Sequence, residues 1–106
     1  MNSELERTIV EIVSYAGDAK SDFIETINDL IENKDINETQ KVYEAGCESF
    51  HKAHSAHMAI LQKFASGESI DGGILLIHAE CQLMSAEDFM TLASQAIEVR
   101  KKINDK

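Results

Sequence analysis

The chain has 106 residues, of which 43% are hydrophobic and 27% charged, and its formal net charge is −9. This length fits one domain, residues 1–106, and excludes two. The negative charge disfavours nucleic acid and favours a basic protein partner. The sequence shows no signal peptide and no apolar run near the roughly 18 residues of a membrane span, so we expect a cytoplasmic protein.

Turn-forming residues cluster at two places, around 33–37 and 66–73, and proline is absent. Two breaks predict three helical segments. In the first, about residues 4–32, apolar residues recur at every third or fourth position, which is typical of an amphipathic helix. These residues are Ile9, Ile12, Val13, Ala16, Ala19, Phe23, Ile27, Leu30 and Ile31.

The second segment begins at a capping signal, either Asp35 with Glu38 or Asn37 with Gln40. It should end at Gly67, because glycine readily takes the left-handed conformation that follows a helix. Its predicted apolar face comprises Val42, Gly46, Phe50, Ala53, His57, Ile60, Leu61 and Phe64. His57 is therefore expected on the core side.

The third segment, from Ser69 or Asp71 to about Asn104, is apolar on two sides at about 100° per residue. One side carries Ile74, Ile77, His78, Cys81, Ser85, Leu92, Ala96, Val99 and Ile103. The nearly opposite side carries Leu76, Ala79, Leu83, Ala86, Met90 and Ile97. An antiparallel, up-down-up three-helix bundle cannot hide both sides. We expect the second side to be buried in a closed homo-oligomer; the alternative is one broad core face with some exposure.

Few residues offer chemistry: the sequence has no glycine-rich phosphate loop, serine nucleophile elbow or HExxH motif. Three of its four histidines, His51, His54 and His57, lie within the segment HKAHSAH. Cys47, His51, His54 and Met58 share one stripe of the second helix, which is compatible with a soft-metal site. Surface and core histidines are the simpler interpretation. The two cysteines, Cys47 and Cys81, have no paired spacing and are expected as free thiols.

Three stretches resemble a known family: EIVSYAGDAKS (residues 11–21), EAGCESFHKAHSAH (44–57) and IHAECQLMSAEDF (77–89). They are similar to the IIA component of the lactose/cellobiose family of the bacterial phosphoenolpyruvate-dependent sugar phosphotransferase system. The resemblance implies an all-α, three-helix subunit that assembles as a homotrimer. It also implies a phosphorylated histidine that opens a motif H-A-Q-D-H-L-M, which aligns with residues 78–84.

By this alignment His78 accepts a phosphoryl group from the phosphocarrier protein HPr. It then passes the group to a cysteine of the IIB component, and the chain meets the membrane only indirectly, through the IIC transporter. A neutral imidazole suits this work because its ring nitrogen attacks without first losing a proton. Backbone amides in the middle of a helix are already bonded, so phosphoryl-binding donors must be side chains. The candidates are Gln82, Ser85, His57 and His54, the last two within the subunit or across an interface.

The chain departs from the family motif at three positions. Cys81 stands where lactose-type members have an aspartate that meets its symmetry mates around an axial metal ion; a neutral thiol suits a hard cation poorly, so we predict a trimer that requires no metal. Gln82 replaces a second histidine and cannot change charge. Glu80, where the family often has glutamine, points about 200° from His78; across an interface it would repel phosphate.

The rival hypothesis is a non-catalytic regulatory or scaffolding helical oligomer. In one form it binds a transition metal through Cys47, His51, His54 and Cys81. In that case function would survive the loss of His78 and would depend on the residues of the second helix.

Overall fold

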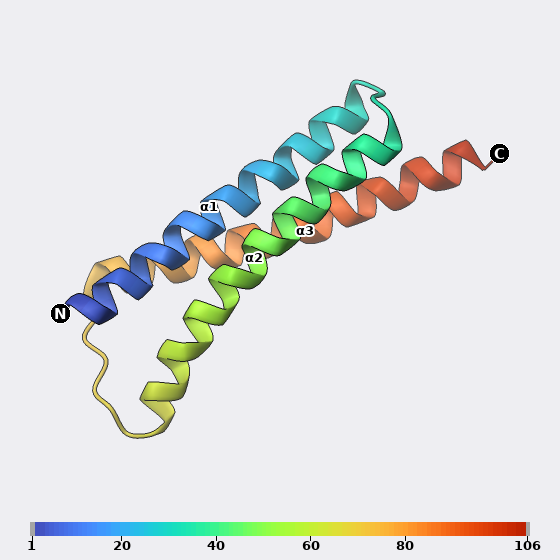
Figure 1. The fold of residues 1–106 in the computed structure, drawn as a ribbon. Helices are drawn as coiled ribbons and strands as arrows, with labels where there is room; N and C mark the ends of the chain where they lie inside the picture. Colours follow the sequence, from blue (N-terminus) through green and yellow to red (C-terminus); the bar gives the residue numbers. More distant parts are fainter. Residues whose placement is uncertain (1, 106) are drawn as a thin grey trace.

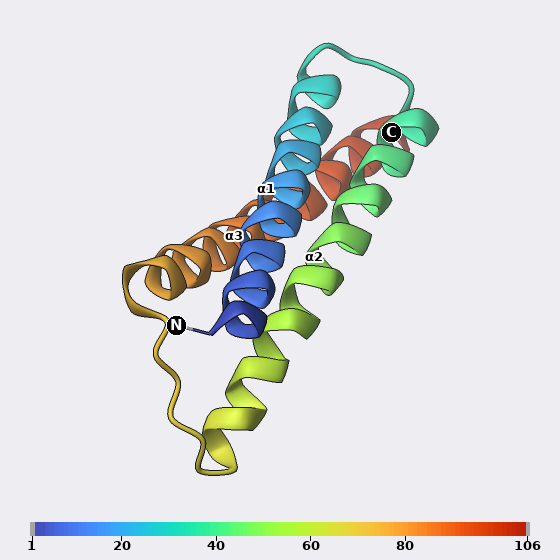
Figure 2. The same cartoon turned by 60° about the vertical axis from the view of Figure 1, so that its left-hand side comes forward.

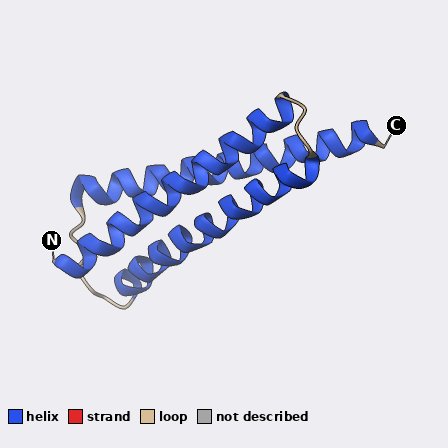
Figure 3. Cartoon of the chain, turned by 45° about the horizontal axis from the view of Figure 1, so that its top comes forward, coloured by secondary structure: helices blue, strands red, loops and turns tan. Residues whose placement is uncertain are grey.

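The computed structural model describes residues 2–105 as three helices joined by two short loops (Figure 1, Figure 3). Helix α1 spans Ser3–Ile31, α2 spans Ile36–Ala65 and α3 spans Gly73–Asn104. The molecule is elongated, with extents of 55 × 20 × 18 Å. The chain runs up, down and up again, so the N-terminus and the α2–α3 loop lie at one end (Figure 1). The predicted all-α, three-helix fold is confirmed.

The first two helices begin at side-chain caps. The Leu5 amide donates to Asn2 Oδ1 (2.7 Å) and the Glu38 amide donates to Asp35 Oδ2 (3.1 Å), so each cap satisfies an amide that has no partner in its own helix. Of the two capping signals predicted for α2, the one at Asp35 is used. Gly67, which follows the C-cap residue Ser66 of α2, has a φ of +99°, which confirms the predicted helix end.

Helix α3 begins later than the sequence predicts. Its first residue is Gly73, and the predicted starts at Ser69 and Asp71 both lie in the loop. The cap position is Gly72, which has no side chain to accept from the first-turn amides, and Gly73 has a φ of +55°. Because glycine tolerates this left-handed backbone, the chain turns sharply here before the helix starts.

Helix α1 lies between the other two and packs against both, whereas α2 and α3 contact each other less (Figure 2). Its buried face is the predicted one over most of its length, from Ile9 and Ile12 to Phe23 and Leu30. Ile31, which was also predicted on this face, is 77% exposed because it is the last residue of the helix.

The side of α3 that is buried within the chain is the one that the sequence analysis assigned to an oligomer interface. Ala79 and Ala86, expected at an oligomer interface, are fully buried within the chain, together with Leu83 and Ile97. Ala79, Leu83 and Ala86 share one core cluster with the fully buried Ala16 and Ala19 of α1, and α3 packs mainly against α1. Small residues allow two helix backbones to approach closely. The prediction assigned this side to the wrong partner.

The opposite side of α3 is exposed. Ile74, Ile77, Leu92, Val99 and Ile103 have exposed fractions of 85%, 61%, 52%, 59% and 61%. We call these residues the exposed α3 stripe. The end of α2 is similarly open, with Leu61 40% and Phe64 66% exposed although both were predicted in the core. These positions lie where α2 and α3 diverge near their connecting loop (Figure 2).

Candidate functional site

Within one chain His78 is exposed, and it lies on the same side of α3 as the exposed α3 stripe. It is the sixth residue of α3, so it stands about 8 Å along the helix axis from the first residue. Side chains of an α-helix lean toward its N-terminus, so the imidazole leans toward the first turn of α3. That turn carries no acidic residue and no side-chain cap.

Gln82 and Ser85 follow His78 on the same side of α3 and are half-buried. The Gln82 amide packs against α1: a Cβ built on Gly17 would lie 3.4 Å from Gln82 Nε2. Residues four apart in a helix are neighbours on its surface, so Gln82 lies one turn from His78. Of the predicted site residues, His78, Gln82 and Ser85 therefore share one edge of a single helix.

His57 does not join this group within the chain. Its Nε2 lies 2.9 Å from Glu80 Oε2, and this contact links α2 to α3. Glu80 is two residues from His78, which places it about 200° around the helix. The His57 ring therefore lies on the α2 side of α3, away from the edge that carries His78. This partnership also holds the Glu80 carboxylate beside an imidazole of its own chain.

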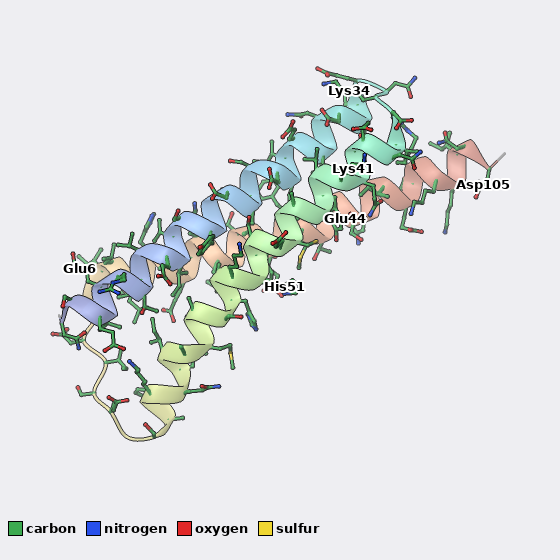
Figure 4. The ribbon with its side chains drawn as sticks, in the orientation of Figure 1. Glu6, Lys34, Lys41, Glu44, His51 and Asp105 are labelled. Atoms are coloured by element: carbon green, nitrogen blue, oxygen red, sulfur yellow. The ribbon has the colours of Figure 1, made fainter. Side chains whose placement is uncertain are left out.

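His54 is exposed, and its ring stacks on Phe50, with ring centroids 6.1 Å apart and an interplanar angle of 17°. His51, labelled midway along α2 in Figure 4, is also exposed. Both rings belong to α2 and lie apart from the α3 edge that carries Gln82 and Ser85.

The metal alternative receives no support from the described residues. Within residues 2–105, no group of three or more His, Cys, Asp or Glu side chains is placed to hold a metal ion. Cys47 is half-buried beside Tyr43, and burial, followed by this neighbour, raises the pKa of the Tyr43 hydroxyl. Cys81 is exposed on the opposite helix. The four proposed ligands therefore do not converge.

Two features of the site were missed by the sequence analysis. One is the contact of His57 with Glu80, and the other is the approach of Gln82 to Gly17. The glycine in the middle of the first predicted helix was a usable signal, because glycine is unfavourable there unless another group approaches closely. The His57 contact had no comparable signal.

The fold and the site together define a helical bundle that carries an accessible histidine next to an exposed apolar helix face. The family model described as "PTS system, Lactose/Cellobiose specific IIA subunit" matches residues 7–101. The lichenan-specific phosphotransferase enzyme IIA component of Bacillus subtilis is 30% identical over 105 residues, covering 99% of this chain and 94% of that protein. The lactose-specific EIIA component of Staphylococcus epidermidis is 34% identical over 92 residues, covering 87% and 88%.

A solved structure agrees with these sequence matches. The crystal structure of the PTS cellobiose-specific enzyme IIA from Bacillus anthracis superposes with a TM-score of 0.89 at 27% identity, covering 100% of this chain and 96% of that chain. This chain therefore belongs to the lactose/cellobiose-specific IIA subunit family of the phosphotransferase system. In residues 2–105, none of the helices has a stretch both long and apolar enough to cross a membrane.

Proposed function

We propose that this protein is a phosphocarrier of sugar uptake, in which His78 accepts a phosphoryl group from HPr and passes it to the cysteine of a IIB component. The observation that carries the proposal is the exposed imidazole of His78, at the first position of the family motif. Both steps need a ring that a partner protein can reach. Both partners place the reaction in the cytoplasm, and the family model that matches residues 7–101 supports a single domain, 1–106.

In the first step, a lone pair on an imidazole nitrogen of His78 attacks phosphorus, a P–N bond forms and the bond from phosphorus to HPr breaks. In the second step the thiolate of IIB attacks the same phosphorus and the P–N bond breaks. Phosphoryl transfer is catalysed mainly by positioning and by donors aimed at the phosphoryl oxygens. His78 supplies the attacking nitrogen, and the neighbouring donors orient the phosphoryl group.

Helix α3 offers mainly uncharged donors for the phosphoryl oxygens. Residues 64–99 contain no Lys or Arg, so the half-buried Gln82 and Ser85 are the polar neighbours on the same edge of α3. Cationic groups would come from the docked partner, in keeping with the net charge of −9.

The exposed α3 stripe supports a homotrimer. Five large apolar side chains along one helix, each more than half exposed, form a surface that a second copy of the helix would cover. Cys81 lies on the same side of α3, in the place of the family's metal-binding aspartate. A neutral thiol there removes the mutual repulsion of carboxylates, so the assembly would not require an axial metal ion.

The proposal is tested by incubating the protein with phosphoenolpyruvate, enzyme I and HPr and measuring its intact mass. The wild-type chain should gain one acid-labile phosphoryl group, and His78→Ala should gain none. His51→Ala, which removes another exposed imidazole, is the matched control and should be phosphorylated as the wild type is. An unmodified wild-type chain, or full phosphorylation of His78→Ala, would contradict the proposal.

A further inference from the structure

Gly17 occupies the middle of α1, a helix of 29 residues. Glycine is, after proline, the least favourable residue in a helix interior, so its presence there needs a structural reason. The glycine inside α2 has an apolar reason: a Cβ on Gly46 would lie 2.7 Å from Phe23 Cε1. Among residues 2–105, and apart from the backbone of α1 itself, the one neighbour of a Cβ on Gly17 within 4 Å is polar, the side-chain amide of Gln82 at 3.4 Å.

The contact lies at the edge of the tight seam between α1 and α3. Ala16 and Ala19 of α1 and Ala79 and Ala86 of α3 are fully buried and belong to one core cluster. Gln82, flanked by the buried Leu83, extends from α3 over the backbone of α1 at this edge. A Cβ at residue 17 would just touch the amide, so a side chain longer than a methyl group would compete with Gln82 for the space over α1.

We propose that Gly17 is a positioning residue that holds the Gln82 amide one turn from the imidazole of His78. This inference rests on the proposed function of His78. A methyl group at 3.4 Å would be an ordinary van der Waals contact with the amide, but the branches of a leucine side chain would fill its volume. In Gly17→Leu the amide would leave the seam, and the donor or acceptor that it offers near His78 would be lost.

The test is a double-mutant cycle on the rate of phosphoryl transfer from HPr. We expect Gly17→Leu to slow the transfer as Gln82→Ala does, by about tenfold to a hundredfold, the range for a hydrogen bond to a charged group. The double variant should be no slower than Gln82→Ala alone, because both changes remove the same contact. If Gly17→Leu acted only by disturbing the helix bundle, it would slow transfer by the same factor in the wild-type protein and in the Gln82→Ala variant. Glu25→Leu, which adds a leucine at an exposed site on α1, controls for the added apolar side chain.

A second measurement does not depend on transfer or on the folding of a variant. In the wild-type protein, nuclear Overhauser contacts should join the side-chain amide protons of Gln82 to the Hα protons of Gly17. If these contacts were absent in a chain that is phosphorylated, the role of Gly17 would be overturned and the proposed function would stand. Losses in transfer rate that multiply in the double-mutant cycle would have the same meaning. A wild-type chain that shows these contacts but is never phosphorylated would overturn the proposed function and, with it, any role of Gly17 in transfer.

Discussion

The acidic side chain of Asp22 lies half-buried on α1, close to Gly46 of α2. Burial, and then the charges of Glu25 and Asp18, raise the pKa of this carboxyl above its usual 3.8. The folded state therefore binds the proton more tightly than the unfolded state does. By linkage, the ionised carboxylate costs stability above the raised pKa, and the cost disappears as the pH falls toward 3.8.

Asp22→Asn should therefore raise the free energy of unfolding at pH 7, by less than about 1 kcal/mol because solvent screens a half-buried group. The gain should shrink as the pH falls through the raised pKa of Asp22. Urea unfolding at several pH values measures this, and Glu11→Gln, which removes an exposed acid from the same helix, is the control. An Asp22→Asn protein that is less stable than the wild type at pH 7 would contradict the argument.

Single residues were predicted unevenly from the sequence. The motif placed His78, Gln82 and Ser85 on one helix edge, because residues four apart always share a face. The partner of His57 was not predictable, because it depends on how α2 and α3 are rotated and spaced relative to each other. Periodicity describes one helix at a time, so it could place His57 toward the core without finding Glu80.

At the scale of elements, the C-terminal end of α1 depends on a side chain from α3. The last turn of α1 has no basic residue of its own. Arg100 of α3 reaches this end, where its guanidinium donates to the carbonyl oxygens of Leu30 and Lys34. A cation that satisfies terminal carbonyls stabilises the negative end of the helix.

Arg100→Ala should lower the free energy of unfolding by about 1 kcal/mol, because the Lys34 carbonyl loses its guanidinium donor while the Leu30 carbonyl keeps the backbone amide of Asn33. Amide exchange in the last turn of α1 should accelerate more than exchange in its middle. Chemical denaturation and hydrogen exchange measure the two effects. Lys102→Ala, at an exposed site of the same helix, should change neither the free energy of unfolding nor the amide exchange. Equal effects of the two substitutions would contradict a capping role of Arg100.

The elements themselves were largely predictable, since long periodic segments bounded by Asp35 and Gly67 leave few alternatives. Two details were wrong. Gly72 and Gly73 delay the start of α3, because neither supplies a side-chain cap. The side of α3 that is buried within the chain was misassigned, because both sides are apolar and hydrophobicity alone does not distinguish them; which side is buried depends on how α3 packs against α1.

At the scale of the whole molecule, the exposed α3 stripe predicts self-association. We expect the wild-type protein to sediment as a trimer with or without chelator, because Cys81 does not provide a site for a hard cation. Leu92→Lys should yield monomers, since it places a charge within the stripe. Its helical circular dichroism should be retained because Leu92 is 52% exposed within one chain. Dissociation of the wild type by chelator, or a trimeric Leu92→Lys protein, would contradict this prediction.

The most direct test of the central claim is to locate the phosphoryl group in the phosphorylated wild-type protein. Fragmentation mass spectrometry at alkaline pH, which preserves phosphohistidine, assigns the modification to one residue. The account predicts that it lies on His78, and that adding a IIB component removes it from His78 and places it on a IIB cysteine. A phosphoryl group found on His51, His54 or His57 instead would contradict the account.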